Sequence, residues 1–269
     1  MNLRGLARAG AMWLAVVAIA GCSADKADVG KTANVKPTGP SGSASSAPAQ
    51  VAAQPNGIDQ LPPQQILEKA AQALETAPSW HVVTGNGKDE IEFSLDDKGD
   101  CRGKRTDEGE AMDFIRQGDS LYARPLGTFW KNHFKDKASQ ARQFVAGRYI
   151  KTSSDDPEFT PLFCSRNMLR ASIFSAESIK AAKLTKGAKT AVVDGVGTLQ
   201  LKGTLQGSAT TLEVATTGKP YPLQVETGDA GTPMRMIFSE FGKSVAGDVP
   251  APADTVGVDE VKQKVGASE

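Results

Sequence analysis

The last third of the chain is built from short segments in which apolar and polar residues alternate, the pattern of strands that bury one face. Asp194-Gly195 joins the first two segments, and Asp-Gly between apolar runs predicts a tight hairpin. Consecutive hairpins produce an antiparallel sheet with one apolar and one polar face. The alternating segments are residues 190–194, 196–202, 210–216, 221–227 and 234–241.

The middle of the chain repeats this pattern and interrupts it with helical segments. Strands are predicted at residues 90–96, 111–116, 120–123 and 147–151, with Cys101 in a further strand. Helical periodicity marks residues 64–77, 128–134, 136–145 and 161–176. The order of a helix, a strand meander, a helical insert and a second meander predicts an α+β fold with one large antiparallel sheet.

The N-terminus has the three parts of a secretory signal. Arg4 and Arg8 precede an uncharged apolar run at residues 11–20, which is too short for a good transmembrane helix. The run leads into Ile19-Ala20-Gly21-Cys22, which resembles a bacterial lipobox. The resemblance implies that the peptide is cut before Cys22, that its thiol receives a diacylglycerol, and that its amino group is acylated, with palmitate for example. We expect a lipid anchor on the extracytoplasmic face of the cell membrane; the alternatives are an uncleaved membrane anchor and a chance Cys after an apolar run.

These features divide the chain into four parts. They are a signal peptide at 1–21, a lipidated Cys and tether at 22–61, one α+β domain at 62–263 and a tail at 264–269. The tether is rich in Gly, Ser, Pro and Ala, so it cannot bury enough apolar area to offset its ordering entropy. A flexible coil of this length has ends roughly 35 Å apart. It would hold the domain off the membrane and still let the domain reach it.

The charge balance limits the possible partners. The chain has 31 basic and 31 acidic residues, and two of the basic residues belong to the signal peptide. The rest is nearly neutral and has no Lys/Arg cluster, which argues against nucleic acid as a partner. We expect the membrane, through the acyl chains, and a lipid or acylated ligand as partners, and we expect a monomer.

Two cysteines remain once Cys22 carries lipid. Cys101 and Cys164 belong to an exported protein, and exported proteins meet an oxidising environment. A disulfide between them is predicted, and it would stabilise the fold by roughly 4 kcal/mol. The alternative is a pair of buried free thiols. Neither Cys has a second Cys or a His close in sequence, so their spacing is no metal signature.

Sequence motifs of catalysis and of metal binding are absent. The chain has no Gly-x-Ser-x-Gly, His-Glu-x-x-His, glycine-rich phosphate loop or Cys-x-x-Cys. Its two histidines, His81 and His133, adjoin aromatic residues and are expected to be packed or surface side chains. We therefore expect no enzyme activity, no cofactor and no metal site. An envelope hydrolase would require one of these histidines to lie beside an oriented Ser or carboxylate.

Several motifs resemble actinobacterial cell-envelope lipoproteins of the LppX/LprG group and the LolA-type carriers. The motifs are Gly118-Asp119-Ser120-Leu121-Tyr122, Phe129-Trp130, Gly147-Arg148-Tyr149-Ile150-Lys151, Val193-Asp194-Gly195-Val196, Thr211-Leu212-Glu213-Val214-Ala215-Thr216, Gly218-Lys219-Pro220-Tyr221-Pro222-Leu223 and Phe238-Ser239-Glu240-Phe241-Gly242. The resemblance spans residues 64 to about 260. It implies a strongly curved antiparallel sheet, a half-barrel, with helices on its concave face. It also implies a cavity between sheet and helices that holds acyl chains.

The inward face of such a sheet would line this cavity. The predicted lining is Phe93, Leu95, Phe114, Trp130, Phe134, Leu212, Val214, Leu223, Met236 and Phe238, with Met112, Phe144, Leu201 and Val225 on the same face. An apolar sheet face under helices is also the pattern of a closed core, so two functions stay open. One is a non-enzymatic lipoprotein that binds or carries a lipid or acylated ligand. The other is a rigid envelope surface or sensor module that binds another protein.

Overall fold

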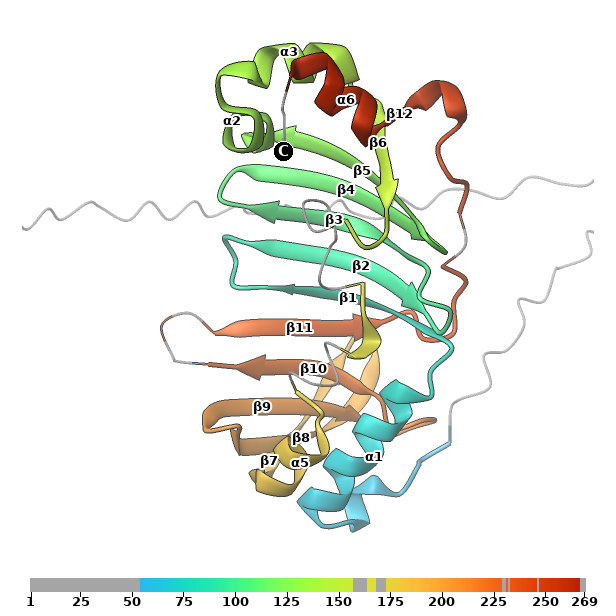
Figure 1. Cartoon of the computed structure of the whole chain (residues 1–269). Coiled ribbons are helices and arrows are strands. Elements are labelled where there is room, and N and C mark those ends of the chain that lie inside the picture. The colour runs from blue at the N-terminus through green and yellow to red at the C-terminus, as the bar shows by residue number, and fades with distance from the viewer. Residues whose placement is uncertain are drawn as a thin grey trace, which may run out of the picture. The chain divides into compact units, whose positions relative to one another are not determined.

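A computed structural model of the chain describes residues 54–156, 164–167, 173–228, 231, 233–245 and 247–266. Within these residues the strands form one curved 12-stranded sheet in the order β12-β6-β5-β4-β3-β2-β1-β11-β10-β9-β8-β7. Two meanders, β1 to β6 and β7 to β11, join side by side where β1 pairs with β11 (Figure 1). Every pairing is antiparallel except the pairing of β12 with β6. The predicted α+β class, with a large curved antiparallel sheet, is confirmed.

Most strands coincide with alternating segments of the sequence, but β7 begins at Lys183 and not at residue 190 as predicted, and β12 matches no predicted segment. Their bounds are β1 Ser79–Gly85, β2 Glu90–Asp96, β3 Cys101–Asp107, β4 Glu110–Gln117, β5 Ser120–Gly127, β6 Tyr149–Ser153, β7 Lys183–Val193, β8 Val196–Leu205, β9 Ser208–Ala215, β10 Pro222–Thr227, β11 Met234–Ser239 and β12 Thr255–Gly257. The predicted Asp194-Gly195 hairpin turn connects β7 to β8, and both of its residues have positive φ angles.

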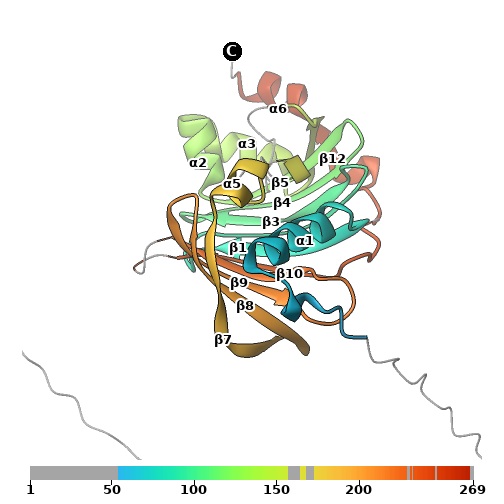
Figure 2. The same cartoon turned by 90° about the horizontal axis from the view of Figure 1, so that it is seen from below.

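The helices cover the concave face at the two ends of the sheet. Their bounds are α1 Pro63–Glu75, α2 Phe129–Phe134, α3 Ala138–Val145, α5 Ala176–Ala181 and α6 Val258–Val265, with short 3-10 turns η1 Ile58–Gln60, η2 Lys135–Lys137 and η3 Pro252–Asp254. Helix α1 contacts β7 and β10, whereas α2 contacts β5 and α6 contacts β6 and β12. Figures 1 and 2 show α1 and α5 together on one side of the sheet. The predicted helices on the concave face are therefore present.

Helix α1 illustrates how the sequence produces this layer. Pro62 and Pro63 start the helix, since proline is tolerated in a first turn where its missing N–H has no intrahelical partner. Ile66, Leu67 and Leu74 recur with helical spacing and are buried against the sheet. The helix ends at Glu75, three residues before Pro78.

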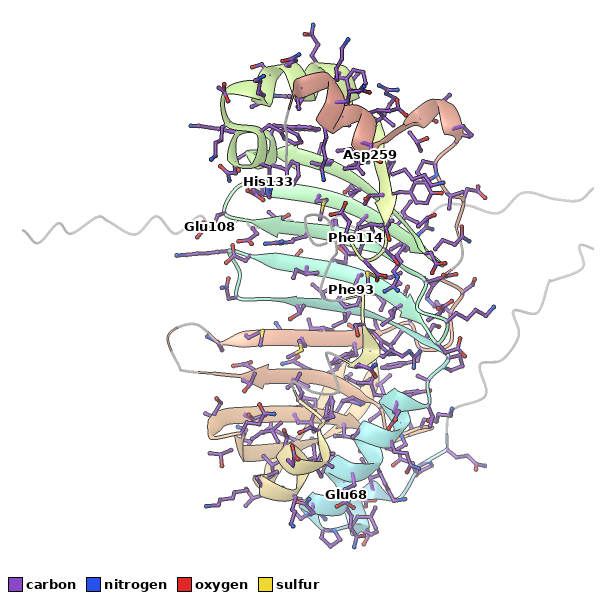
Figure 3. The ribbon with its side chains drawn as sticks, in the orientation of Figure 1. Glu68, Phe93, Glu108, Phe114, His133 and Asp259 are labelled. Atoms are coloured by element: carbon purple, nitrogen blue, oxygen red, sulfur yellow. A yellow bond between two sulfur atoms is a disulfide. The ribbon has the colours of Figure 1, made fainter. Side chains whose placement is uncertain are left out.

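The middle of the concave face depends on a glycine. Gly103 of β3 lies directly between Phe93 of β2 and Phe114 of β4, and both phenylalanines are almost completely buried. Figure 3 labels the two side chains near the middle of the sheet. A Cβ atom on Gly103 would lie 2.6 Å from the Phe93 Cβ and would also contact the Glu92 carbonyl. Glycine therefore lets β2 and β3 approach closely under the two rings.

We expect Gly103→Ala to lower the free energy of unfolding by about 2 kcal/mol, because the added methyl group overpacks rigid backbone and a buried ring. Urea unfolding measures the change. Gly231→Ala is the matched control, since a Cβ there meets nothing within 4 Å. Equal stability of the two variants would show that β2 and β3 separate without cost.

Three predicted boundaries differ from the structure. Residues 54–61 belong to the predicted tether, yet Ile58 is 1% exposed and the Asn56 N–H donates to the Thr216 carbonyl. Two aliphatic residues, Ile58 and Leu61, in a polar segment are too weak a signal to predict this packing. At the other end, α6 runs to Val265, which is buried, so the folded unit passes residue 263.

The third difference concerns the helix predicted at 161–176, half of which lies outside the described residues; Arg166 and Asn167 within it are helical. Its described end is not helical, because Ile173 and Phe174 form a turn and a bend. Ser175 instead caps α5 by accepting a hydrogen bond from the Ser178 N–H. The apolar spacing of Ile173 and Phe174 reflects burial in a turn and not a helix.

Candidate ligand-binding face

The predicted cavity residues are buried or partly buried in the described unit. Seven from the sheet belong to the core cluster on the concave face, namely Phe93, Leu95, Phe114, Leu212, Val214, Met236 and Phe238, whereas Leu223 is buried at a β-bulge of β10 outside that cluster. Trp130 on α2 is buried, and Phe134 is partly buried against the same cluster. Leu201 and Val225 are buried as well, and Met112 and Phe144 pack at the margin of the cluster.

Trp80 of β1 stands at the centre of an aromatic group on this face. Its ring makes edge contacts with Phe93 and Phe238, at centroid distances of 5.7 and 5.8 Å. Such T-shaped pairs add to the stabilisation that burial provides. The group links the two meanders, because β1 pairs with β2 on one side and with β11 on the other.

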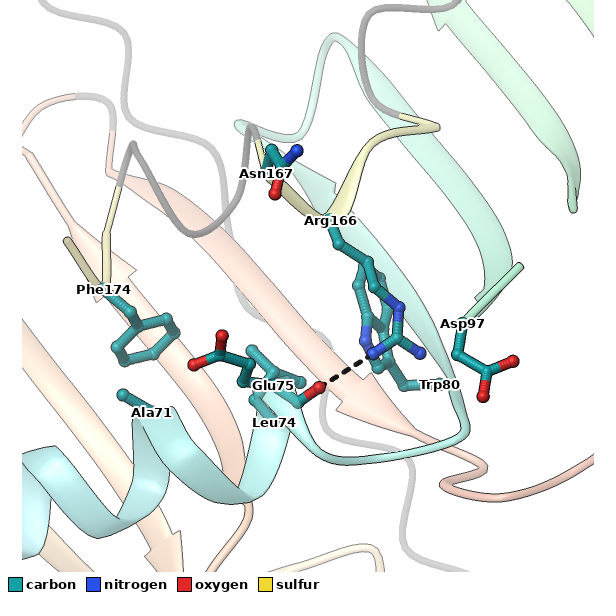
Figure 4. Close-up of a pocket in the computed structure, with 8 residues that line it drawn as sticks. All are labelled: Ala71, Leu74, Glu75, Trp80, Asp97, Arg166, Asn167 and Phe174. Atoms are coloured by element: carbon teal, nitrogen blue, oxygen red, sulfur yellow. Dashed lines mark hydrogen bonds between the residues drawn. The ribbon is translucent and has the colours of Figure 1, made fainter. Parts of the chain in front are cut away.

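A pocket of about 290 Å³ opens beside Trp80, at the C-terminal end of α1 (Figure 4). Its apolar wall is formed by Ala71, Leu74, Trp80 and Phe174, and its polar rim by Glu75, Asp97, Arg166 and Asn167. None of the ten predicted cavity residues lines it. Leu74 and Phe174 were recognisable as buried apolar positions, but the sequence could not show that they face each other across an opening.

Arg166 fastens its segment to the end of α1. Its guanidinium donates to four carbonyls, those of Glu75, Ala77, Pro78 and Asp96, at 2.7 to 3.1 Å. The C-terminal carbonyls of a helix have no intrahelical partner, so this arginine satisfies groups that α1 leaves open. Burial lowers the pKa of the guanidinium from its ordinary value, and the carboxylates of Asp97 and Asp96 oppose this shift.

The disulfide predicted from the sequence is present. Cys101 and Cys164 are bonded, with their Cα atoms 5.7 Å apart. Cys101 starts β3 and faces the concave side beside Leu95, while the Cys164 carbonyl accepts a hydrogen bond from Arg116 of β4 at 3.3 Å. Residues 164–167 are therefore attached to the sheet through Cys164 and to α1 through Arg166. The bridge thus holds this segment against the sheet.

A second, shallow depression of about 420 Å³ lies on the convex face of the sheet; we call it the convex-face groove. Its lining residues are His81, Glu92, Phe93, Ser94, Arg102, Gly103, Lys104, Asp113, Phe114, Ile115, Arg124 and Tyr149. The charges along it alternate from strand to strand. Lys104 Nζ lies 2.8 Å from Glu92, Arg124 Nε donates to Asp113 at 3.0 Å, and the Arg124 guanidinium lies over the Tyr149 ring.

His81 lies in this groove between a serine and a carboxylate, the arrangement that a hydrolase would need. His81 Nδ1 is 3.1 Å from Ser94 Oγ, and Nε2 is 3.6 Å from Glu92 Oε1. The Glu92 carboxylate, however, is closer to Lys104 than to His81. Ser94 lies within a regular strand that pairs with a strand on each side. The backbone N–H groups around it belong to the sheet and form no set of free donors that could stabilise an oxyanion. We assign the three residues to a surface hydrogen-bond network.

The second histidine has a structural setting. His133 of α2 stacks on Phe129 at a centroid distance of 4.1 Å, and its Nε2 lies 3.7 Å from Glu110. Within the described ranges, no group of three or more His, Cys, Asp or Glu side chains could hold a metal ion. Nor does that part of the chain contain a helix of the length and apolarity needed to span a membrane. Cys22 lies outside the described residues, so its lipidation stays a prediction.

The described unit is a half-barrel with covering helices and an apolar concave side, and the solved structures similar to it include two mycobacterial proteins. The crystal structure of LprF from Mycobacterium bovis has 12% identity and a TM-score of 0.46, with 70% of this chain and 96% of that chain covered. Lipoprotein LppX from Mycobacterium tuberculosis has 14% identity and a TM-score of 0.44, with 69% and 97% covered. Both are of the LppX/LprG type that the sequence motifs resemble. No protein-family model and no curated protein matches the chain.

Proposed function

We propose that this chain is a non-enzymatic envelope lipoprotein, anchored through Cys22, that binds an acylated ligand on the concave face of its sheet. The observation that carries the proposal is the pocket of about 290 Å³ beside α1, with an apolar wall and a polar rim. Apolar walls with a few polar groups are typical of small-molecule sites. The separation of an apolar wall from a polar rim matches an amphiphile, whose chain needs apolar contact and whose head needs polar partners.

The size of the pocket sets what it can hold. Ligand pockets usually measure about 300–1,000 Å³, so this one suits one acyl chain or part of a larger lipid. Burial contributes roughly 25 cal/mol for each Å² of chain surface removed from water, which yields several kcal/mol for one tail. Binding of this kind depends on apolar area and needs no reactive side chain.

Native mass spectrometry of residues 23–269, exported without the lipidated Cys, tests the proposal. We expect co-purified lipid or uptake of a fluorescent fatty acid. Ala71→Trp should block uptake, since Ala71 lines the pocket, whereas Gln72→Trp on the exposed side of α1 should leave uptake intact. A uniformly ligand-free protein that takes up neither fatty acid nor phospholipid would sink the proposal.

The anchor has its own test. We expect Cys22→Ala to move the protein from the membrane fraction to the medium, or to leave it as unprocessed precursor, because the lipidated thiol is gone. Fractionation followed by intact-mass analysis measures both outcomes. A processed Cys22→Ala protein that stays with the membrane would mean that the lipobox does not provide the anchor.

The close packing of the predicted cavity residues favours a second function, a rigid module that binds another envelope protein. Phe93, Leu95 and Phe114 are at most 1% exposed, as in a closed core. The convex-face groove, with its alternating charges, would then be the contact surface. Charge reversal at Lys104 and Arg124 would abolish partner binding in this case and leave lipid uptake unchanged.

A further inference from the structure

The pocket beside α1 has a closed inner end, which Trp80 forms. Three of the rim residues, Glu75, Asp97 and Asn167, are exposed to solvent. Trp80 is 2% exposed, the smallest value among the described lining residues, and Figure 4 shows its ring behind the Arg166 side chain. Exposure therefore decreases from the rim to Trp80, which places the indole ring at the bottom of the pocket.

The core behind Trp80 is closely packed. Phe93 and Phe238 contact the indole ring edge-on, at centroid distances of 5.7 and 5.8 Å, and each is 1% exposed. Neither phenylalanine lines the pocket. Their strands, β2 and β11, pair with β1 on either side, so the backbone holds the three rings at neighbouring positions. An alkyl chain that enters past the rim therefore ends against Trp80.

With its inner end closed, the volume of the pocket sets a chain length. A methylene group takes up nearly as much space as a water molecule, roughly 30 Å³, so a pocket of about 290 Å³ holds about ten carbons of a straight chain. The methylenes of a longer chain would lie outside, among the exposed polar side chains of the rim, where little apolar area is buried.

We propose that Trp80 limits the alkyl chain that this pocket accepts to about ten carbons, so that the ligand is an amphiphile that inserts one chain of medium length. Each methylene that enters the pocket removes a similar apolar area from water. Affinity should therefore rise about fourfold for each carbon up to this length and then level off. This inference rests on the proposed function and adds the size of the chain.

Two series of straight-chain ligands test this limit. Residues 23–269 are titrated by calorimetry with saturated fatty acids from hexanoate to tetradecanoate, and with alkan-1-ols from hexan-1-ol to tetradecan-1-ol, each below its aggregation limit. We expect affinity to level off at about ten carbons. The two headgroups differ in charge, so a break that the pocket sets should fall at the same chain length in both series.

Variants of the pocket wall should move the break in opposite directions. Phe is smaller than Trp by about three non-hydrogen atoms, so Trp80→Phe should move the break to a chain about three carbons longer. Ala71→Leu adds a similar volume to the wall and should move the break to a chain about three carbons shorter. Trp130→Phe is the matched control, because this buried Trp of α2 does not line the pocket, and it should leave the break unchanged.

Each outcome has a separate meaning. Affinity that keeps rising to tetradecanoate in the wild-type chain would overturn the length limit and leave the proposed function standing. A break that Ala71→Leu moves and Trp80→Phe does not would overturn the role of Trp80. Ala71 is half-buried, so Ala71→Leu keeps the limit testable even where Trp80→Phe does not fold. Binding of no member of either series would overturn the proposed function itself.

Discussion

Removal of the Cys101–Cys164 disulfide is expected to lower the free energy of unfolding by about 4 kcal/mol. The two cysteines are 63 residues apart, and the bridge removes the loop-closure entropy of a segment of that length from the unfolded chain. Both sulfurs lie in the core, where Cys101 is 1% and Cys164 is 3% exposed. The double variant Cys101→Ser, Cys164→Ser should therefore also place two hydroxyl groups in apolar surroundings.

Urea unfolding of the wild-type chain, of the same chain under reducing conditions and of the double Ser variant measures this effect. For a folded unit of about 200 residues, a loss of 4 kcal/mol corresponds to a fall of roughly 8–16 °C in Tm. Reduction isolates the covalent contribution, because it leaves the sulfur atoms in place. A change below about 1 kcal/mol on reduction would mean that the segment is held by its other contacts alone.

The strands of the second meander could be predicted from the sequence because their signals are local. Alternation over five to eight residues and the Asp194-Gly195 turn are enough to place β7 and β8 side by side. The junction of the meanders could not be predicted in this way. Val82 of β1 lies opposite Phe238 of β11, a pairing between residues far apart in the chain that no turn fixes. Side-chain packing across the concave face determines it.

The site was only partly predictable, because most of its contacts join residues that are far apart in the chain. The disulfide followed from counting, since two cysteines remained once Cys22 was assigned to the lipid. The hydrogen bonds of Arg116 and Arg166 have no sequence signal, because each depends on which carbonyls the fold brings within reach. The pocket beside Trp80 likewise depends on where α1 ends relative to β1. Alternation shows that a face is apolar, but it does not show whether helices close over that face or leave a gap.

Replacement of Arg166 by Met is expected to lower the free energy of unfolding by about 3 kcal/mol. The variant loses four hydrogen bonds from a charged donor, each of which contributes on the order of 1 kcal/mol. The carbonyls of Glu75 and Ala77 at the end of α1 then depend on water that enters through the pocket. The stability of Arg166→Lys should lie between that of the wild-type chain and that of Arg166→Met, because one ammonium cannot reach all four carbonyls. Arg124→Met, which breaks a half-exposed ion pair on the convex face, should cost no more than about 1 kcal/mol.

The two attachments of residues 164–167 should not act independently. Arg166 is two residues from Cys164, so a chain already released from the sheet gains less from the bonds of Arg166 to α1. A cycle of Arg166→Met and the double Ser variant should therefore show a combined loss that is smaller than the sum, by about 1 kcal/mol or more. Agreement with the sum within about 0.5 kcal/mol would mean that each attachment holds its own part of the segment. The pocket wall contributed by Phe174 would then not depend on the disulfide. Titration of all four proteins with the fluorescent fatty acid would in that case show the same affinity.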